Sequence, residues 1–397
     1  MAKPPKRRLP LLAPREEDRN LRPSYAVWEI TLACDLACRH CGSRAGRARP
    51  EELTTAECLD VVDQLADLGV LEVTLIGGEA YLRDDWLEIV RAIRARGMQA
   101  TMTTGGRGIT RELAERAAAA GLQRVSVSID GDERSHDALR GARGSYRAAL
   151  AALDHLREAG IRTAVNTQIN RMTWPHLASL LEVIIAKGAR AWQLAITAPM
   201  GRAAEEPELL LQPEDFLDLF PDLAALKRRC DEAKVIFWPA NNIGYFGPYE
   251  HVFRGASRKG HMSSCTAGRK SIGIEADGTV KGCPSLPTAQ WAAGNVRDAP
   301  LRDIWLGGEP LRYTRVRTVD DLWGYCRDCY YAEACLAGCT WTSQVLLGRP
   351  GNNPYCHHRA LERRRAGLRE RLVPAEPAPN EPFDHGRFDI VLEEIGT

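Results

Sequence analysis

Six short β-rich runs alternate with amphipathic helical stretches between residues 27 and 197, and this alternation restricts the fold most strongly. The runs are VWEITLAC (27–34), EVTLIGG (72–78), QATMTTGG (99–106), RVSVSIDG (124–131), RTAVNTQIN (162–170) and AWQLAIT (191–197). Strands separated by helices of this length pair in parallel as βαβ units. Six such units predict an α/β fold, a partial (β/α)6 TIM-type barrel rather than a complete eight-unit one.

The helical stretches carry recognisable ends. Helices are expected over residues 54–68 and 84–96, with Thr54 and Asp84 as N-caps and a glycine after each helix as its stop. A further helix is expected over residues 213–227. In a parallel α/β fold the chemistry sits at the carboxyl ends of the strands, so motifs at those ends are candidates for function.

Composition excludes several classes of protein. The 397 residues contain 53 Lys plus Arg against 52 Asp plus Glu, which argues against general nucleic-acid binding. No apolar run approaches the roughly 20 residues of a membrane span. The basic N-terminus, MAKPPKRRLPLLAP, has too short an apolar stretch for a secretory signal. We therefore expect a cytoplasmic protein with neither nucleic acid nor membrane as a partner.

Twelve cysteines are present, and most of them cluster at short spacings. A disulfide framework is the alternative to metal ligation, but such frameworks dominate small secreted domains. Because this chain is long and lacks an export signal, metal ligation is the favoured interpretation.

The first cysteine group, Cys34, Cys38 and Cys41, reads C-x3-C-x2-C at the end of the first β-rich run. Three thiolates on one tight loop can bind three irons of a cubane cluster and leave the fourth open to an exogenous chelator. Zinc is the rival, because His40 could supply the fourth ligand of a closed site. Three cysteines without a metal remain the plain alternative. Two-cluster ferredoxins use a different spacing.

The loop CDLACRHC resembles the signature loop of the radical S-adenosylmethionine (SAM) superfamily, and IGGEAYLRDD (76–85) resembles the Gly-Gly-Glu motif of that family. The resemblance implies a SAM-binding iron–sulfur cluster on the three cysteines. It also implies that Gly77, Gly78 and Glu79 hold the amino end of SAM, with Glu79 as the anion for the ammonium group. An ordinary glycine-rich strand-to-helix turn is the alternative.

The ends of later strands resemble further SAM-contacting segments of the family. VSVSIDG (125–131) and HDALRG (136–141) imply contacts to the ribose and carboxylate of SAM. Asn166 or Asn170 is a ribose candidate, and Gln193 with the run PMGRA (199–203) is a candidate for the adenine end or carboxylate. Ordinary polar capping of strand ends is the alternative for each. The cofactor-binding candidates are Gly77, Gly78, Glu79, Ser126, Ser128, Asp130, Arg140, Asn166 and Gln193.

The C-terminal cysteines follow the pattern Cys265-x12-Gly278-x4-Cys283, then Cys326-x2-Cys329-x5-Cys335-x3-Cys339, then Cys356. This pattern resembles the SPASM domain of radical SAM enzymes, and a pair of zinc knuckles is the alternative. The resemblance implies two auxiliary clusters. The first is held by Cys265, Cys283 and Cys339, and the second by Cys326, Cys329, Cys335 and Cys356.

The resemblance thus implies three [4Fe–4S] clusters, one SAM-binding and two auxiliary. Cys58 and Cys230 sit in helical patterns beside apolar residues and are expected to be inert core cysteines. The first auxiliary cluster then lacks a fourth cysteine, so we expect one iron open to another donor. His261 or Cys230 is the alternative ligand.

The chain is expected to divide into five segments: a basic extension (1–24), the barrel (25–235), a connector (236–262), the SPASM domain (263–372) and a Pro-rich acidic tail or strap (373–397). The connector is rich in glycine and aromatic residues and is expected to line the substrate entrance, with Tyr245 and Tyr249 as its test residues. A packed inter-domain connector is the alternative.

The resemblance implies an enzyme that reductively cleaves SAM to a 5′-deoxyadenosyl radical and abstracts hydrogen from its substrate. Maturation of a ribosomally made peptide or protein, by cross-link, thioether or oxidation, is the leading expectation. Radical oxidation or decarboxylation of a small molecule, such as a sugar alcohol or a tetrapyrrole side chain, is the alternative. An iron–sulfur electron-transfer or scaffold protein is the non-enzyme alternative. An external donor of the flavodoxin or ferredoxin type is expected. Because few residues precede the first strand, a peptide substrate would need a separate leader-binding adaptor or direct binding.

Overall fold

The computed structural model describes residues 21–244, 246–255 and 265–395. Its strands are β1 (Tyr25–Glu29), β2 (Glu72–Ile76), β3 (Gln99–Thr104), β4 (Arg124–Ser128), β5 (Arg162–Ile169), β6 (Ala191–Ile196), β7 (Ile236–Pro239), β8 (Ser271–Ile274), β9 (Thr279–Lys281), β10 (Gly294–Asn295), β11 (Leu368–Glu376) and β12 (Arg387–Glu394). The first ten form one sheet in the order β10-β9-β8-β1-β2-β3-β4-β5-β6-β7. Neighbours from β8 through β1 to β7 pair in parallel.

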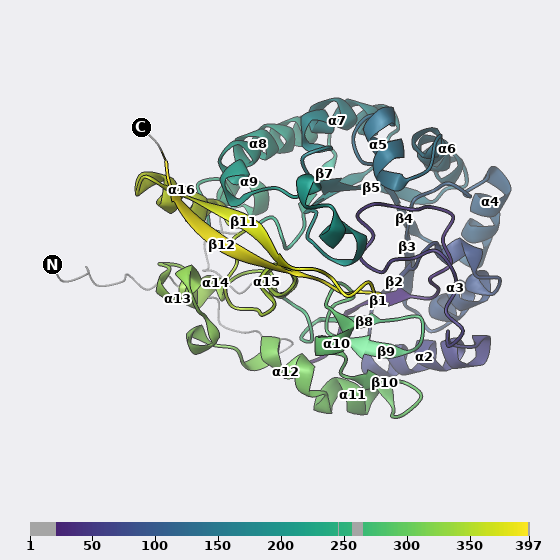
Figure 1. Cartoon of the computed structure of the whole chain (residues 1–397). Helices are drawn as coiled ribbons and strands as arrows, with labels where there is room; N and C mark the ends of the chain where they lie inside the picture. The colour runs from purple at the N-terminus through teal and green to yellow at the C-terminus, as the bar shows by residue number, and fades with distance from the viewer. Residues whose placement is uncertain (1–20, 245, 256–264, 396–397) are drawn as a thin grey trace.

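Helices cover the outer face of the curved parallel sheet (Figure 1). They are α2 (Thr55–Leu68), α3 (Trp86–Ala95), α4 (Arg111–Ala120), α5 (Glu133–Arg140), α6 (Ser145–Glu158), α7 (Leu177–Ala186) and α8 (Phe216–Glu232). Single 3-10 turns lie between them at η1 (Ala80–Leu82), η2 (Trp174–His176), η3 (Gly201–Glu205), η4 (Pro207–Leu209) and η5 (Pro213–Asp215). The predicted partial barrel of βα units is therefore confirmed.

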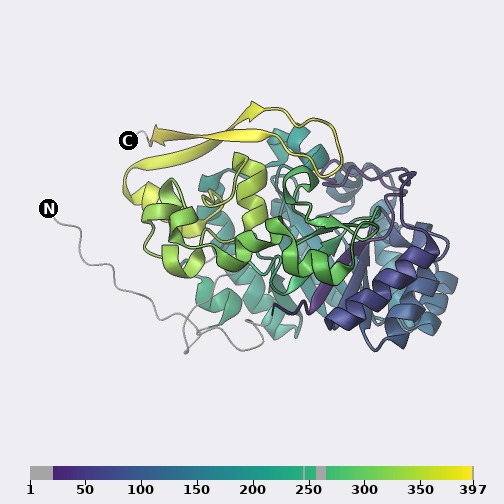
Figure 2. The same cartoon turned by 90° about the horizontal axis from the view of Figure 1, so that it is seen from below.

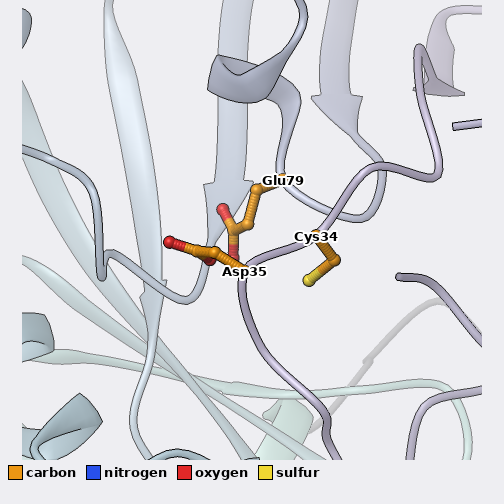
Figure 3. Close-up of side chains that lie close together, drawn as sticks. All are labelled: Cys34, Asp35 and Glu79. Atoms are coloured by element: carbon orange, nitrogen blue, oxygen red, sulfur yellow. The ribbon is translucent and has the colours of Figure 1, made fainter. Parts of the chain in front are cut away.

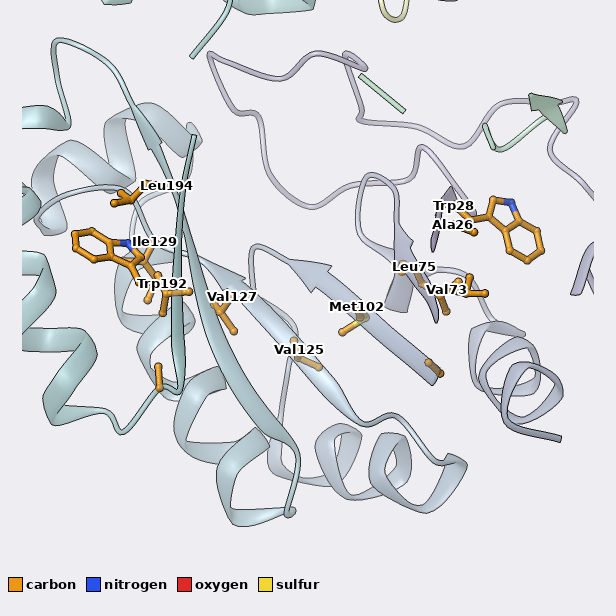
Figure 4. Packing of buried hydrophobic residues seen from close by; sticks show 14 of the residues in the cluster. Ala26, Trp28, Val73, Leu75, Met102, Val125, Val127, Ile129, Trp192 and Leu194 are labelled. Carbon is orange, nitrogen blue, oxygen red and sulfur yellow. The ribbon is translucent and has the colours of Figure 1, made fainter. Parts of the chain in front are cut away.

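The core lies between the sheet and these helices. Alternate residues of each strand face the helices and are buried, among them Trp28, Leu75, Val127 and Trp192 (Figure 4). Burying one large apolar side chain of this kind contributes roughly 1.5–3 kcal/mol. The intervening residues of the strands face the opposite side of the sheet, which is the barrel interior.

Two helix ends differ from the sequence prediction. Thr54 caps α2 in a capping box with Glu57, as predicted. The predicted N-cap Asp84 is wrong by one residue, because α3 begins after Asp85. The Asp85 carboxylate makes no capping bond and instead binds Arg83 and Thr55. The helix predicted from residue 213 begins as the turn η5 and becomes α8 only three residues later.

The sheet extends beyond the six predicted strands at both sides. β7 pairs with β6 inside the stretch expected to be a connector. It escaped prediction because it has only four residues, and Ile236 and Trp238 are 60% and 58% exposed. At the other side β8, which belongs to the cysteine-rich region, pairs with β1 from Tyr25 opposite Ser271. The barrel and the cysteine-rich region therefore share one sheet.

The cysteine-rich region is otherwise built from short helices. They are α10 (Thr288–Trp291), α11 (Leu301–Gly307), α12 (Glu309–Val316), η6 (Val319–Asp321), α13 (Tyr325–Asp328), α14 (Ala332–Cys335), α15 (Thr340–Leu347) and α16 (His357–Arg365). Helix α9 (Glu250–Arg254) precedes this region, inside the stretch expected to be a connector. Among the described residues, no helix combines the length and apolar character that a membrane span needs.

The Pro-rich C-terminal segment forms an antiparallel hairpin of β11 and β12, which we call the strap (residues 368–394). It runs from the cysteine-rich helices across the molecule toward the loop that follows β1 (Figures 1 and 2). Of the two expected forms, a flexible tail or a strap, the structure has the strap. The expected boundary at residue 373 falls inside β11.

Candidate functional site

Residues 30–46, which we call the cluster loop, follow β1 and carry the first cysteine group. The thiols of Cys34, Cys38 and Cys41 lie close enough to perturb one another electrostatically. Burial, reinforced by Glu79 and the neighbouring thiolates, raises the pKa of Cys34 to about 12. Burial also raises the pKa of Cys38. A bound iron cluster would convert these thiols to thiolate ligands, so the three cysteines on one loop fit such a cluster.

Gly77 and Gly78 hold the cluster loop from the side of β2. Gly78 N donates to Thr31 O at 2.9 Å, and Glu79 N donates to Ala33 O at 2.7 Å. A Cβ at Gly77 would lie 2.4 Å from Thr31 O, and one at Gly78 would lie 2.0 Å from Ala33 O. The glycines therefore allow the backbone that leads to Cys34 to approach closely.

Asp130 and Arg140 hold the loop from the side of α5. Arg140 Nε donates to Asp130 Oδ2 at 2.8 Å, and its Nη1 lies 3.8 Å from Cys38 Sγ. Both side chains are buried, and Asp130 Oδ1 also accepts from Gln168 N at 2.7 Å. The two residues thus bind each other and Cys38, which places them beside the cluster ligands.

The PMGRA run packs behind the third cysteine. Arg202 N donates to Cys41 O at 3.0 Å, and the Arg202 guanidinium donates to Ala45 O at 3.1 Å. Gly201 has φ +58°, and a Cβ there would lie 2.3 Å from Cys41 O. The run expected near adenine or carboxylate therefore supports the cluster loop itself.

Glu79 lies beside Cys34, together with an acidic residue that the sequence reasoning missed. Ligand atoms of Cys34, Asp35 and Glu79 lie within 4.8 Å of one another (Figure 3). Glu79 is 2% exposed and accepts from Gly105 N at 2.6 Å and from the Thr104 hydroxyl. Burial raises the pKa of Glu79 to about 7, although these two hydrogen bonds act to lower it. A cationic ligand would relieve that unfavourable burial of charge.

Asp35 is held by Tyr81, whose hydroxyl donates to Asp35 Oδ2 at 3.0 Å. Asp35 Oδ1 is buried and has no hydrogen-bond partner among the described residues. The sequence signal that could have identified Asp35 is its position directly after Cys34, together with the position of Tyr81 two residues after Glu79. Two carboxylates therefore converge beside Cys34, an arrangement that suits a cationic ligand.

The polar strand-end candidates lie on the barrel interior. In the strand register Ser128 is opposite Asn166, and Asn166 is opposite Gln193, so the three form one row. Ser126 lies nearer the start of β4, opposite Thr103 and Ala164. Asn166 Oδ1 is buried without a hydrogen-bond partner among the described residues, so it is available to a ligand.

Asn170, the alternative to Asn166, is used by the fold. Its Oδ1 accepts from the backbone amides of Met172 and Thr173, and its Nδ2 donates to Thr197 Oγ1 at 3.2 Å. It is fully buried. Asn170 therefore closes a turn after β5, and Asn166 is the better ligand candidate.

Cys265, Cys283 and Cys339, the first auxiliary set, come together in the cysteine-rich region. Burial and the other two thiols raise the pKa of Cys339 to about 12. The Thr340 hydroxyl lies 3.3 Å from Cys265 Sγ. The set fits an iron–sulfur cluster with three protein thiolates.

The second auxiliary set lines one cavity, whose cysteines are Cys326, Cys329, Cys335 and Cys356. Two backbone amides donate to these sulfurs at 3.4 Å, Tyr331 N to Cys329 and Asn353 N to Cys326. Amide donors to sulfur are a usual feature of iron–sulfur sites. Four thiols with such donors fit a cluster that the protein ligates completely.

The structure also bears on the disulfide alternative and on the two cysteines outside the three groups, Cys58 and Cys230. No disulfide joins any two cysteines within the described part of the chain, which contains all twelve, so the disulfide framework has no support. Cys58 and Cys230 lie in the apolar core, as predicted. Among the described residues, the charged groups that act on Cys230 are Lys227, Arg229 and Asp231 of its own helix, and no thiol of the first auxiliary set is among them.

His40 does not join the first cysteine group. Its ring is buried among Arg140, Asp130 and His136, and burial lowers its pKa to about 3. The zinc alternative, which needed His40 as a fourth ligand, has no support.

Tyr245, expected at the substrate entrance, and His261, an alternative cluster ligand, lie outside the described residues. Tyr249 packs against Phe253 and His357, with ring centroids 6.4 and 5.6 Å away. For Tyr249, the packed-connector alternative is the better description.

Two family models match this chain. The radical SAM superfamily model covers residues 28–182, and the SPASM model, described as an iron–sulfur cluster-binding domain, covers residues 265–330. These spans contain both the cluster loop and most of the auxiliary cysteines.

Three relatives align over most of the chain. An AdoMet-dependent heme synthase of Nitratidesulfovibrio vulgaris is 30% identical over 356 residues, which are 86% of this chain and 94% of that protein. Mycofactocin maturase MftC of Mycolicibacterium smegmatis is 30% identical over 340 residues, 84% of this chain and 82% of that protein. The PqqA peptide cyclase of Rhizobium meliloti is 27% identical over 361 residues, 89% of this chain and 90% of that protein. The chain therefore belongs to the radical SAM superfamily, in the group that carries a SPASM domain.

Proposed function

We propose that the protein is a peptide-maturing radical SAM enzyme, which modifies a ribosomally made peptide or protein by cross-link, thioether or oxidation. When bound, the cluster on Cys34, Cys38 and Cys41 supplies the electron that cleaves SAM, and the resulting 5′-deoxyadenosyl radical abstracts a hydrogen atom from the substrate.

The side chains around the cluster loop hold SAM in this proposal. Glu79, with Asp35 beside it, binds the ammonium group through charge-assisted hydrogen bonds. Asn166 uses its unpaired carbonyl for the ribose hydroxyls. The remaining proposed contacts or supports of SAM are Gly77, Gly78, Ser126, Ser128, Asp130, Arg140 and Gln193.

The observation that best supports a peptide substrate is sequence similarity along nearly the whole chain. A mycofactocin maturase and a PqqA peptide cyclase align with both the barrel and the cysteine-rich region.

A second candidate is radical oxidation or decarboxylation of a small molecule, such as a tetrapyrrole side chain. It is favoured by the heme synthase, which this chain covers to 94% at 30% identity. The non-enzyme alternative is disfavoured, because an electron carrier has no use for two converging carboxylates beside its cluster.

The proposal includes three [4Fe–4S] clusters, with the SPASM cysteines holding two of them. It also includes a cytoplasmic location and an electron donor of the flavodoxin or ferredoxin type. A separate adaptor that presents the leader of the peptide is the proposed partner for substrate delivery.

A substrate comparison tests the proposal. Reconstituted enzyme with SAM and dithionite is offered either a deuterated short peptide encoded beside its gene or a deuterated iron porphyrin with propionate side chains. Mass spectrometry should find deuterium in 5′-deoxyadenosine and a mass change in the peptide. Deuterium transfer from the porphyrin alone would replace the peptide function with the second candidate.

A further inference from the structure

One buried guanidinium lies between the two auxiliary cysteine sets. Building on the proposed auxiliary clusters, we propose that Arg317 is a positioning residue that raises the reduction potential of both clusters and orients Cys265 through Thr340. Arg317 follows α12 directly and is 7% exposed. Neither cysteine spacing nor the barrel pattern points to it.

On one side Arg317 reaches the first set through a relay. Its Nη1 donates to Thr340 Oγ1 at 3.1 Å, and that hydroxyl lies 3.3 Å from Cys265 Sγ. A guanidinium can only donate, so the Thr340 oxygen accepts from Arg317 and its own hydrogen is free to point at the sulfur. The contact therefore fixes the hydroxyl as a donor to Cys265.

On the other side Arg317 reaches the backbone that joins the two sets. Its Nη2 donates to Gly338 O at 3.4 Å, and Gly338 lies between Cys335 of the second set and Cys339 of the first. The charge of Arg317 also lies close enough to Cys335 to act on it electrostatically. A single cation thus acts on both groups of thiols.

The location makes the charge effective. Arg317 is shielded from solvent, and its guanidinium carbon lies 5.8 Å from the centre of the Tyr313 ring. A charge in such surroundings is screened far less than one on the surface. Reduction adds negative charge to an iron–sulfur cluster, so a buried cation and a hydroxyl donor to sulfur both favour the reduced form.

The planar fork of arginine distinguishes the two effects. Two separate nitrogens reach Thr340 and Gly338 at once, which the point charge of lysine cannot reproduce. Arg317→Lys should therefore keep much of the charge effect on both clusters but weaken the relay to Cys265. Thr340→Val should remove the relay alone.

Redox titration tests the proposal in full-length protein whose Cys34, Cys38 and Cys41 are changed to Ala, so that only auxiliary clusters contribute. The iron and sulfide content of each protein is measured first. The midpoint potential of each auxiliary cluster is then determined by redox titration monitored by electron paramagnetic resonance. Arg317→Gln should shift both potentials to more negative values. Thr340→Val should shift one potential only, that of the first cluster. Arg312→Gln, on the exposed face of α12, the helix that precedes Arg317, should shift neither.

Unchanged potentials in Arg317→Gln with full auxiliary iron would overturn the proposal. If Arg317→Gln loses iron, the test rests on Thr340→Val and Arg317→Lys instead. Unchanged midpoint potentials in both of these variants would also overturn the proposal. A parent protein that binds only one auxiliary cluster would instead refute the proposed cluster count, which the iron analysis reports before any variant is compared.

Discussion

The guanidinium of Arg44 binds the carboxylate of Asp384 through Nε at 3.0 Å and Nη2 at 3.2 Å, across 340 positions of sequence. The two side chains are 10% and 5% exposed. Asp384 O also accepts from Gly201 N at 2.8 Å, and Phe383 N donates to Gly42 O at 3.1 Å. The tip of the strap is thereby fastened to the loop that carries the first cysteine group.

Asp384→Asn should release the strap tip. Among the described residues, the change leaves the buried Arg44 with the half-exposed Glu205 as its one remaining acidic partner, at a cost of roughly 3 kcal/mol. Amides that donate to Asp384, those of Asn380 and Glu381, should exchange hydrogen roughly 100-fold faster by mass spectrometry. Asp389→Asn is the control, because its ion pair on the same hairpin is exposed. Equal exchange in both variants would show that the pair does not hold the tip.

Glu79→Gln should weaken SAM binding by about one to two orders of magnitude, because a hydrogen bond to a charged group contributes roughly 1.5–3 kcal/mol. Isothermal calorimetry measures the dissociation constant. Glu57→Gln is the matched control, since Glu57 is on the outer helix α2 and pairs with Arg297. An unchanged constant for Glu79→Gln would refute its assignment to the ammonium group.

Glu29 makes the stability of the fold depend on pH. Burial, then the neighbouring carboxylate of Glu275, raises its pKa from 4.5 to about 8. Between these values the folded protein keeps a proton that the unfolded chain has released, so stability falls as pH rises from 4.5 to 8.

Glu29→Gln removes this titration. Relative to the natural protein it should be more stable above pH 8 by up to roughly 4 kcal/mol, with little difference near pH 5. Urea unfolding at several pH values measures the difference. A constant difference across the range would show that Glu29 titrates normally in the folded state.

The first auxiliary cluster should accept an added ligand. Only three cysteines gather there, and Cys230 lies in the apolar core of α8. Adding a small thiol to protein without the SAM-binding cluster should perturb one auxiliary paramagnetic signal. Cys230→Ala should keep its full iron content. Loss of iron in that variant, with no response to thiol, would mean that Cys230 closes the site.

The barrel could be predicted from the sequence because the patterns that specify each βα unit are local. Each βα unit combines an apolar alternation with a cap such as Thr54 and a stop such as Gly69, and these patterns are read within a few residues. β7 was missed because it is short and half-exposed. The strap was left undecided because its order depends on distant contacts such as Asp384 with Arg44.

The candidate site divides in the same way. Cysteine spacing indicated which thiols gather, since loops and turns fix neighbours a few positions apart. It gave no sign of Asp35, whose role depends on Tyr81 and Glu79, or of Arg317, which reaches Thr340 from the end of α12. Side chains that act through tertiary contacts leave no periodic trace in a sequence.

Reductive cleavage of SAM tests the central claim most directly. Anaerobic enzyme with dithionite and SAM should release 5′-deoxyadenosine, measured by liquid chromatography. The variant with Cys34, Cys38 and Cys41 all changed to Ala should release none while it keeps its auxiliary iron. Undiminished release from this variant would contradict the assignment of the SAM-cleaving cluster to these three cysteines.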